Sequence, residues 1–115
     1  MEPKDNGTNN SYEVQIQNRV KKVVSALQEK LSPDKIILFS QKFNLQGQVS
    51  SFKLCLVTPT EDKTKTELDV YLAVDSAVPF DVLIYTPEEW QIALGRTNSF
   101  ASRIQEGGVV LYERQ

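Results

Sequence analysis

Two apolar segments separated by a polar one, within residues 34–58, constrain the fold of this chain more than any other feature. Residues 36–39 form a continuous apolar run, which is typical of a strand covered on both faces. In residues 51–58 apolar side chains alternate, which predicts one face with Phe52, Leu54 and Leu56, and another with Ser51, Lys53, Cys55 and Val57. The pattern predicts two strands, residues 35–40 and 51–58, which are antiparallel because only a short reversal joins them.

The residues before these strands predict a tail and one helix. Residues 1–9 are polar, contain Gly and Pro and show no periodicity, so we expect a disordered tail. Asn10 as N-cap with Glu13 three residues later is a capping-box arrangement, which predicts the start of a helix. Apolar residues then recur at helical spacing as far as Leu31. Residues 10–115 are therefore predicted to form a single domain.

The residues after the two strands alternate between helical and strand patterns. Residues 61–76, with Leu68 and Leu72 among their apolar residues, favour a crossover helix, although their threonines are also compatible with a strand. Residues 78–85 alternate as a third strand. The next helix starts with an N-cap threonine, a proline and a glutamate at the third position (Thr86-Pro87-Glu88-Glu89), and Gly95 is predicted to close it in a left-handed cap.

A short helix, residues 99–106 with Phe100 and Ile104 inward, and a final strand, residues 109–112, complete the predicted elements. Their order predicts an α+β fold, an α/β mixed sheet of about four strands flanked by helices. The second and third strands are joined through a helix, so we expect them to be parallel with a right-handed crossover.

Composition excludes several classes of site. The chain has no histidine, which removes the usual general base, Ser-His and Cys-His nucleophiles, and the common zinc sites. A net charge of −2 disfavours nucleic acid as a partner. No apolar run approaches the ~20 residues needed to cross a membrane. The one cysteine, Cys55, lies within a strand pattern, so we expect a cytoplasmic protein with a structural thiol.

The Thr-Pro-Glu-Glu-aromatic stretch at residues 86–90 and the closing GGVVLYER at residues 107–114 carry a resemblance to a known family. The chain resembles minimal nucleotidyltransferases of the DNA polymerase beta superfamily from residue 34 to residue 114. In that family the first strand ends in Phe-Gly-Ser and Asp-x-Asp opens the second. Here Phe39-Ser40-Gln41 and Ser51-Phe52-Lys53 stand at these positions, and Asp81 stands where the family has its third carboxylate.

The resemblance implies the fold without the catalytic chemistry. In active members the three carboxylates hold two magnesium ions, and the Gly-Ser turn lets the backbone approach the phosphates. The pairing of Ser51-Phe52-Lys53 with the family motif can shift by one residue, but residues 44–56 contain no Asp or Glu, so no shift restores the acids. We therefore expect no catalytic residue and no bound metal, and a degenerate site at Ser40, Gln41, Ser51, Lys53 and Asp81.

A catalytically inactive domain acting as a binding or regulatory module is the function that this resemblance implies. Small transferases of the family are paired with HEPN-domain proteins in two-gene modules, including toxin–antitoxin pairs. A HEPN-like helical protein or a second copy (a homo-oligomer) is therefore the expected partner, and nucleotide binding is expected to be weak. The alternative is an active nucleotidyltransferase that transfers a nucleotide from ATP to protein or RNA with rebuilt or trans-supplied metal ligands. Only that alternative requires Mg²⁺ as a cofactor.

Each candidate site also has a structural interpretation, which we favour. Asp81 and Lys53 are expected to form an ion pair at a sheet edge rather than a remaining ligand site. Trp90 is expected to be a core anchor of a short helix. The other groups with a favoured structural role are a solvated basic helix face (Arg19, Lys21, Lys22) and a solvated acidic helix surface (Glu61, Asp62, Glu67, Asp69).

Overall fold

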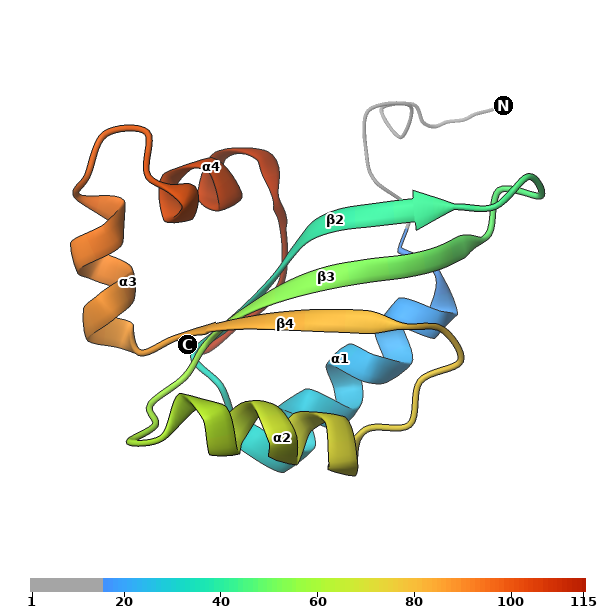
Figure 1. The fold of residues 1–115 in the computed structure, drawn as a ribbon, viewed down its shortest axis with the longest axis horizontal. Coiled ribbons are helices and arrows are strands. Elements are labelled where there is room, and N and C mark those ends of the chain that lie inside the picture. Colours follow the sequence, from blue (N-terminus) through green and yellow to red (C-terminus); the bar gives the residue numbers. More distant parts are fainter. Residues whose placement is uncertain (1–15) are drawn as a thin grey trace.

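The computed structural model describes residues 16–115 as an α+β fold on a four-stranded mixed sheet (Figure 1). The elements in chain order are α1 (Asn18–Leu31), β2 (Lys35–Phe43), β3 (Val49–Val57), α2 (Lys63–Ala73), β4 (Phe80–Tyr85), α3 (Pro87–Leu94), α4 (Phe100–Gly107) and β5 (Val109–Glu113). The strand order is β4-β3-β2-β5, with β2 antiparallel to β3 and β5, and β3 parallel to β4. The antiparallel and parallel pairings expected from the sequence are confirmed.

Helices cover both faces of the sheet (Figure 1). On one face, Phe52, Leu54 and Leu56 join the core cluster formed with α1 and α2. On the other face, Cys55 and Val57 pack with residues of α3 and α4, namely Trp90, Ala101 and Ile104. The alternation predicted for residues 51–58 is confirmed, and the continuous apolar run of β2 reflects burial on both sides.

Strands β2 and β3 continue beyond α3 and α4 as a hairpin arm (Figure 1). Its turn is built on Asn44, whose side-chain Oδ1 accepts the backbone N–H groups of Gln46 and Gln48, each at 2.9 Å. The start of α1 is tied to this arm. Gln17 Oε1 accepts the N–H of Val49 at 2.8 Å, and Gln17 Nε2 donates to the carbonyl of Gly47 at 2.9 Å.

The N-terminal helix starts later than the sequence predicts. The expected tail (residues 1–9), the N-cap Asn10 and its partner Glu13 lie outside the described residues. Gln17, however, has extended backbone angles (φ −74°, ψ 155°) and precedes the first helical residue, Asn18. A continuous helix from residue 11 is therefore wrong, because the hydrogen bonds of Gln17 to the hairpin arm fix an extended entry into α1.

Within residues 61–76 the chain forms a helix rather than a strand: α2 covers Lys63–Ala73, and the side chain of its N-cap, Asp62, accepts the N–H of Lys65 at 3.0 Å. The capping box of α3 is confirmed: Thr86 Oγ1 accepts the N–H of Glu89 at 3.1 Å, and Glu89 Oε1 accepts the N–H of Thr86 at 3.0 Å. The left-handed cap at Gly95 is wrong, because its φ is −74° and its N–H bonds back to the carbonyls of the last turn.

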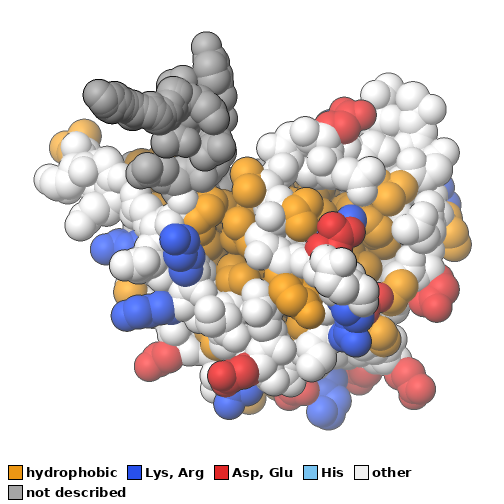
Figure 2. All heavy atoms as spheres, turned by 180° about the vertical axis from the view of Figure 1, so that it is seen from behind, with side chains coloured by type: hydrophobic (Ala, Val, Ile, Leu, Met, Phe, Trp, Pro, Cys, Tyr) orange, Lys and Arg blue, Asp and Glu red, His pale blue; other side chains and the backbone are white. Residues whose placement is uncertain are grey.

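Phe100 does not lie inward as expected. Its side chain is 48% exposed and contacts Phe39 edge-on, with ring centroids 5.7 Å apart, while Ile104 of the same helix is buried as expected. Seen from behind, hydrophobic side chains gather across the middle of the surface, where β5 forms an edge of the sheet (Figure 2). No helix among residues 16–115 is long and apolar enough to cross a membrane.

Candidate functional site

The strand register brings four of the five expected site residues to one face of the sheet. Ser40 pairs with Lys53 across β2 and β3, and Lys53 pairs with Asp81 across β3 and β4. Ser51 lies two residues before Lys53 on the same strand, so its side chain points to the same side. Cys55, two residues after Lys53, packs under α3 and α4, which identifies this side as the α3–α4 face. Beyond these helices the face is open, and Lys53 and Asp81 are exposed.

Gln41 does not join this group. It pairs with Phe52, which is buried in the core under α1 and α2, so Gln41 points to the opposite face. The cause is a β-bulge between Leu38 and Ser40, where the register of β2 against β3 shifts. Gln41 Oε1 is buried there, and no residue in the described range 16–115 offers it a hydrogen bond. The expected five-residue site is therefore corrected to Ser40, Ser51, Lys53 and Asp81.

Lys53 and Asp81 are register neighbours, but the expected ion pair does not form. Among residues 16–115 no ion pair joins these two side chains within 4.0 Å. Both side chains are exposed, so water solvates each charge and the gain from direct pairing is small. Lys53 nevertheless places an ammonium on the strand next to Asp81, which is the one acid among the four residues of the candidate site.

No other part of the described chain supplies a metal-binding cluster. Residues 16–115 contain no group of three or more Asp, Glu or Cys side chains close enough to hold an ion. The acidic residues near α2 have structural or solvated positions, with Asp62 capping the helix and Asp69 paired with Lys65 at 3.3 Å. In the basic face of α1, Arg19 Nη1 donates to the carbonyl of Val49 at 2.8 Å, and Lys21 and Lys22 are exposed. The expected solvated positions are confirmed for Lys21, Lys22 and Asp62, whereas Arg19 is half-buried against the hairpin arm.

Cys55 and Trp90 belong to the core. Burial raises the pKa of the Cys55 thiol to about 12, and the nearby Lys35 lowers that pKa only in part. The thiol is therefore neutral at physiological pH and is no nucleophile. Trp90 is almost fully buried and meets Tyr85 edge-on, with ring centroids 5.2 Å apart. Its Nε1 has no hydrogen-bond partner within the part of the chain that the structure describes. The expected core roles of both residues are confirmed.

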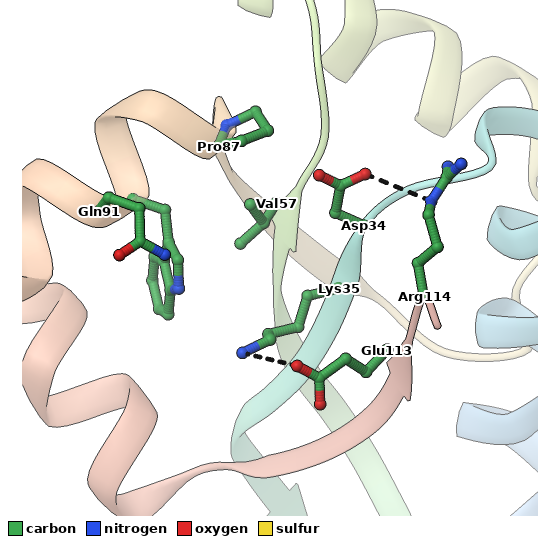
Figure 3. A pocket seen from close by; sticks show the side chains of 8 residues that line it. Asp34, Lys35, Val57, Pro87, Gln91, Glu113 and Arg114 are labelled. Carbon is green, nitrogen blue, oxygen red and sulfur yellow. Dashed lines mark ion pairs between the residues drawn. The ribbon is translucent and has the colours of Figure 1, made fainter.

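A separate polar cavity of about 280 Å³ lies where the first residues of β2 meet the end of β5 and the start of α3 (Figure 3). The residues that line it are Asp34, Lys35, Val57, Pro87, Trp90, Gln91, Glu113 and Arg114. Lys35 Nζ lies 3.3 Å from Glu113 Oε2, and Arg114 Nε lies 3.4 Å from Asp34 Oδ1. These two pairs face each other in Figure 3. The four charges balance, so the cavity has no excess charge with which to attract a charged ligand.

The sequence analysis did not predict these two ion pairs. The signal for them is the pair of dipeptides Asp34-Lys35 and Glu113-Arg114, whose charges are complementary when β2 and β5 run antiparallel. That signal depends on knowing that β5 pairs with β2, which is a long-range contact. The pairs attach the C-terminal strand to the first strand of the sheet, and Arg114 also donates to the carbonyl of Ser32.

Comparison with known proteins gives no relative: no family model, no curated protein and no solved structure matches this chain.

Proposed function

We propose that this chain is a catalytically inactive domain with a nucleotidyltransferase-like fold that acts as a binding or regulatory module. The observation that carries the proposal is the register of Lys53 with Asp81 on an open sheet face. Magnesium and other hard cations need several oxygen ligands. Asp81 offers one carboxylate, and the ammonium on the neighbouring strand repels a divalent cation. This face therefore lacks the oxygen ligands that metal-dependent nucleotidyl transfer needs.

The order and direction of the elements support the fold assignment within this proposal. The residue pattern predicted an antiparallel first pair of strands, a parallel second pair joined through a helix, and two helices after the third strand, and the chain has this arrangement. Ser40, Ser51, Lys53 and Asp81, which the resemblance pairs with the carboxylates and the phosphate turn of the family, lie on one face of the sheet. The side chain of Gln41 points away from that place, so the phosphate turn is also altered.

A protein partner is the target that the surface of such a module supports best. Large apolar side chains are exposed on the hairpin arm, on three helices and on the edge strand: Phe43, Leu45, Leu68, Tyr71, Leu72, Ile92, Phe100 and Val110. Where such side chains form a contiguous patch, they mark a surface that another protein covers. A helical protein of the HEPN kind or a second copy of this chain can cover these apolar side chains. For a nucleotide, residues 16–115 offer no preformed cleft with an excess of charge.

Incubation with magnesium and ATP labelled at the α-phosphate, with candidate protein or RNA acceptors, tests the proposal. We expect no label on any acceptor and no retention of ATP in equilibrium dialysis beyond a buffer blank. Label that appears with wild type and disappears with Asp81→Ala would contradict the proposal and favour an active transferase. The matched control is Asp69→Ala, an exposed acid on α2, which is expected to leave both measurements unchanged.

A further inference from the structure

The polar cavity between β2, β5 and the start of α3 is lined by a side chain with an unused hydrogen-bond donor. Trp90 lines this cavity and is only 2% exposed. Its Nε1 finds no acceptor among residues 16–115. A buried N–H group without a partner destabilises the folded chain, and such groups are rare in native proteins. A ligand oxygen in the cavity would give this N–H the acceptor that the described chain does not supply.

Lys35 supplies further donors at the less exposed end of the cavity. Its side chain is 20% exposed, whereas the other three charged side chains of the lining are 38% to 57% exposed. In Figure 3 the Lys35 side chain extends from β2 toward α3, the helix that carries Trp90. A lysine ammonium has three N–H donors, and the contact with Glu113 Oε2 at 3.3 Å occupies one of them. Trp90 and Lys35 together therefore favour an anionic, two-oxygen group such as a carboxylate.

The more exposed end of the cavity carries two acceptors. The side chains of Glu113 and Asp34 are 57% and 38% exposed, and each bears a carboxylate that can accept hydrogen bonds from an ammonium group. The four charges of the lining balance, so a ligand with a net charge gains little from them. A ligand that carries one charge of each sign meets partners for both and leaves the balance unchanged.

The size and the apolar wall of the cavity restrict the ligand further. Pockets that hold drug-sized molecules measure about 300–1,000 Å³, so a cavity of about 280 Å³ admits a smaller compound. Val57, Pro87 and the Trp90 ring form the apolar part of the lining. A compact apolar group next to the two charged groups fits this wall.

We propose that this cavity binds a free aliphatic amino acid as its zwitterion. The α-carboxylate accepts hydrogen bonds from Trp90 Nε1 and Lys35 Nζ, and the ammonium group lies toward the carboxylates of Asp34 and Glu113. The aliphatic side chain packs on the apolar wall. None of these residues belongs to the candidate site on the open sheet face, so an absence of amino-acid binding would leave the function proposed above unchanged.

Titration with L-valine, followed by Trp90 fluorescence and by calorimetry, tests the proposal. Trp90 is the one tryptophan of the chain, so a ligand beside it changes the emission directly. Two matched probes each lack one charge: isovalerate is valine without its ammonium group, and isobutylamine is valine without its carboxylate. We expect saturable binding of L-valine and at least about tenfold weaker binding of either probe, since each loses a set of charged hydrogen bonds.

Two variants locate the ligand. Lys35→Met keeps the length of the side chain without its ammonium, and Trp90→Phe keeps an aromatic ring without the N–H group. Each is expected to weaken L-valine binding by at least about tenfold in calorimetry. The matched control is Lys65→Met, which removes an exposed lysine of α2 outside the cavity lining and is expected to bind like wild type. Circular dichroism establishes that each variant is folded, and the comparison of probes on wild type needs no variant.

Three results would overturn the proposal. An absence of saturable L-valine binding would show that water alone serves the donors of this cavity. Isovalerate or isobutylamine that binds as tightly as L-valine would show that the site does not select a zwitterion. L-valine binding that is unchanged in both Lys35→Met and Trp90→Phe would place the ligand elsewhere on the protein.

Discussion

Replacing Gln41 with methionine is expected to stabilise the protein by about 1 kcal/mol. Gln41 Oε1 is buried and has no hydrogen-bond partner among residues 16–115, on the face where its strand neighbour Phe52 lies in the core. A buried polar atom without a partner costs about 1–3 kcal/mol in the folded state. Methionine has a similar length and no group that needs a hydrogen bond, so it removes this cost. Gln41 is only partly buried, so the side-chain amide is partly hydrated and the lower end of that range applies.

Urea unfolding followed by the fluorescence of Trp90, the one tryptophan, measures this change. We expect a higher midpoint with an unchanged slope, and a melting temperature raised by about 4–8 °C for a domain of this size. Gln105→Met, on the exposed side of α4, is the control and is expected to stay within about 0.5 kcal/mol of wild type. If Gln41→Met is no more stable than that control, the oxygen has a partner in solution, such as an ordered water, and the reasoning is refuted.

Three further predictions follow from the described contacts. A double-mutant cycle of Lys53→Ala and Asp81→Ala in urea is expected to give a coupling of at most about 1 kcal/mol, because both side chains are exposed; a larger coupling would show direct contact. The backbone hydrogen bond of Thr86, followed by the nearby lysine of α2, lowers the pKa of Glu89 below its ordinary 4.5. The ionised Glu89 carboxylate therefore contributes to folding stability above pH 4.5, and this contribution is lost as the pH falls through the lower pKa of the folded state. Glu89→Gln is expected to flatten the pH dependence of stability in that acidic window, and an unchanged dependence would contradict the assignment. Cys55 is expected to resist a thiol reagent at pH 8 until the protein unfolds, since burial keeps the thiol neutral; rapid labelling of native protein would argue against it.

The parts of the fold that the sequence predicts correctly rest on short-range patterns. The alternation of residues 51–58 assigned side chains to the two faces of β3, since the period of a strand is two residues wherever it lies. The start of α3 at Thr86 was likewise recognisable, because a capping box is formed within four residues. The parallel pairing of β3 with β4 followed from the intervening helix, since a parallel connection needs a long crossover.

The errors occur where distant residues decide local structure. The start of α1 depends on hydrogen bonds from Gln17 to residues about thirty positions later in the chain. The bulge that turns Gln41 away from the candidate site depends on how β2 pairs with β3, which no local pattern reveals. On α2, apolar residues occur on both sides, so the sequence alone did not tell that Val70 faces the core while Leu68 and Leu72 face solvent.

Calorimetric titration with Mn²⁺ tests the central claim, that the sheet face with Lys53 and Asp81 does not bind a catalytic metal, most directly. We expect no stoichiometric binding to wild type, because Asp81 is the one carboxylate among Ser40, Ser51, Lys53 and Asp81, and Lys53 stands beside it. The Ser51→Asp/Lys53→Asp variant places three carboxylates together and is expected to gain a site that Asp81→Ala then removes. A micromolar Mn²⁺ site in wild type that is abolished by Asp81→Ala would contradict the account.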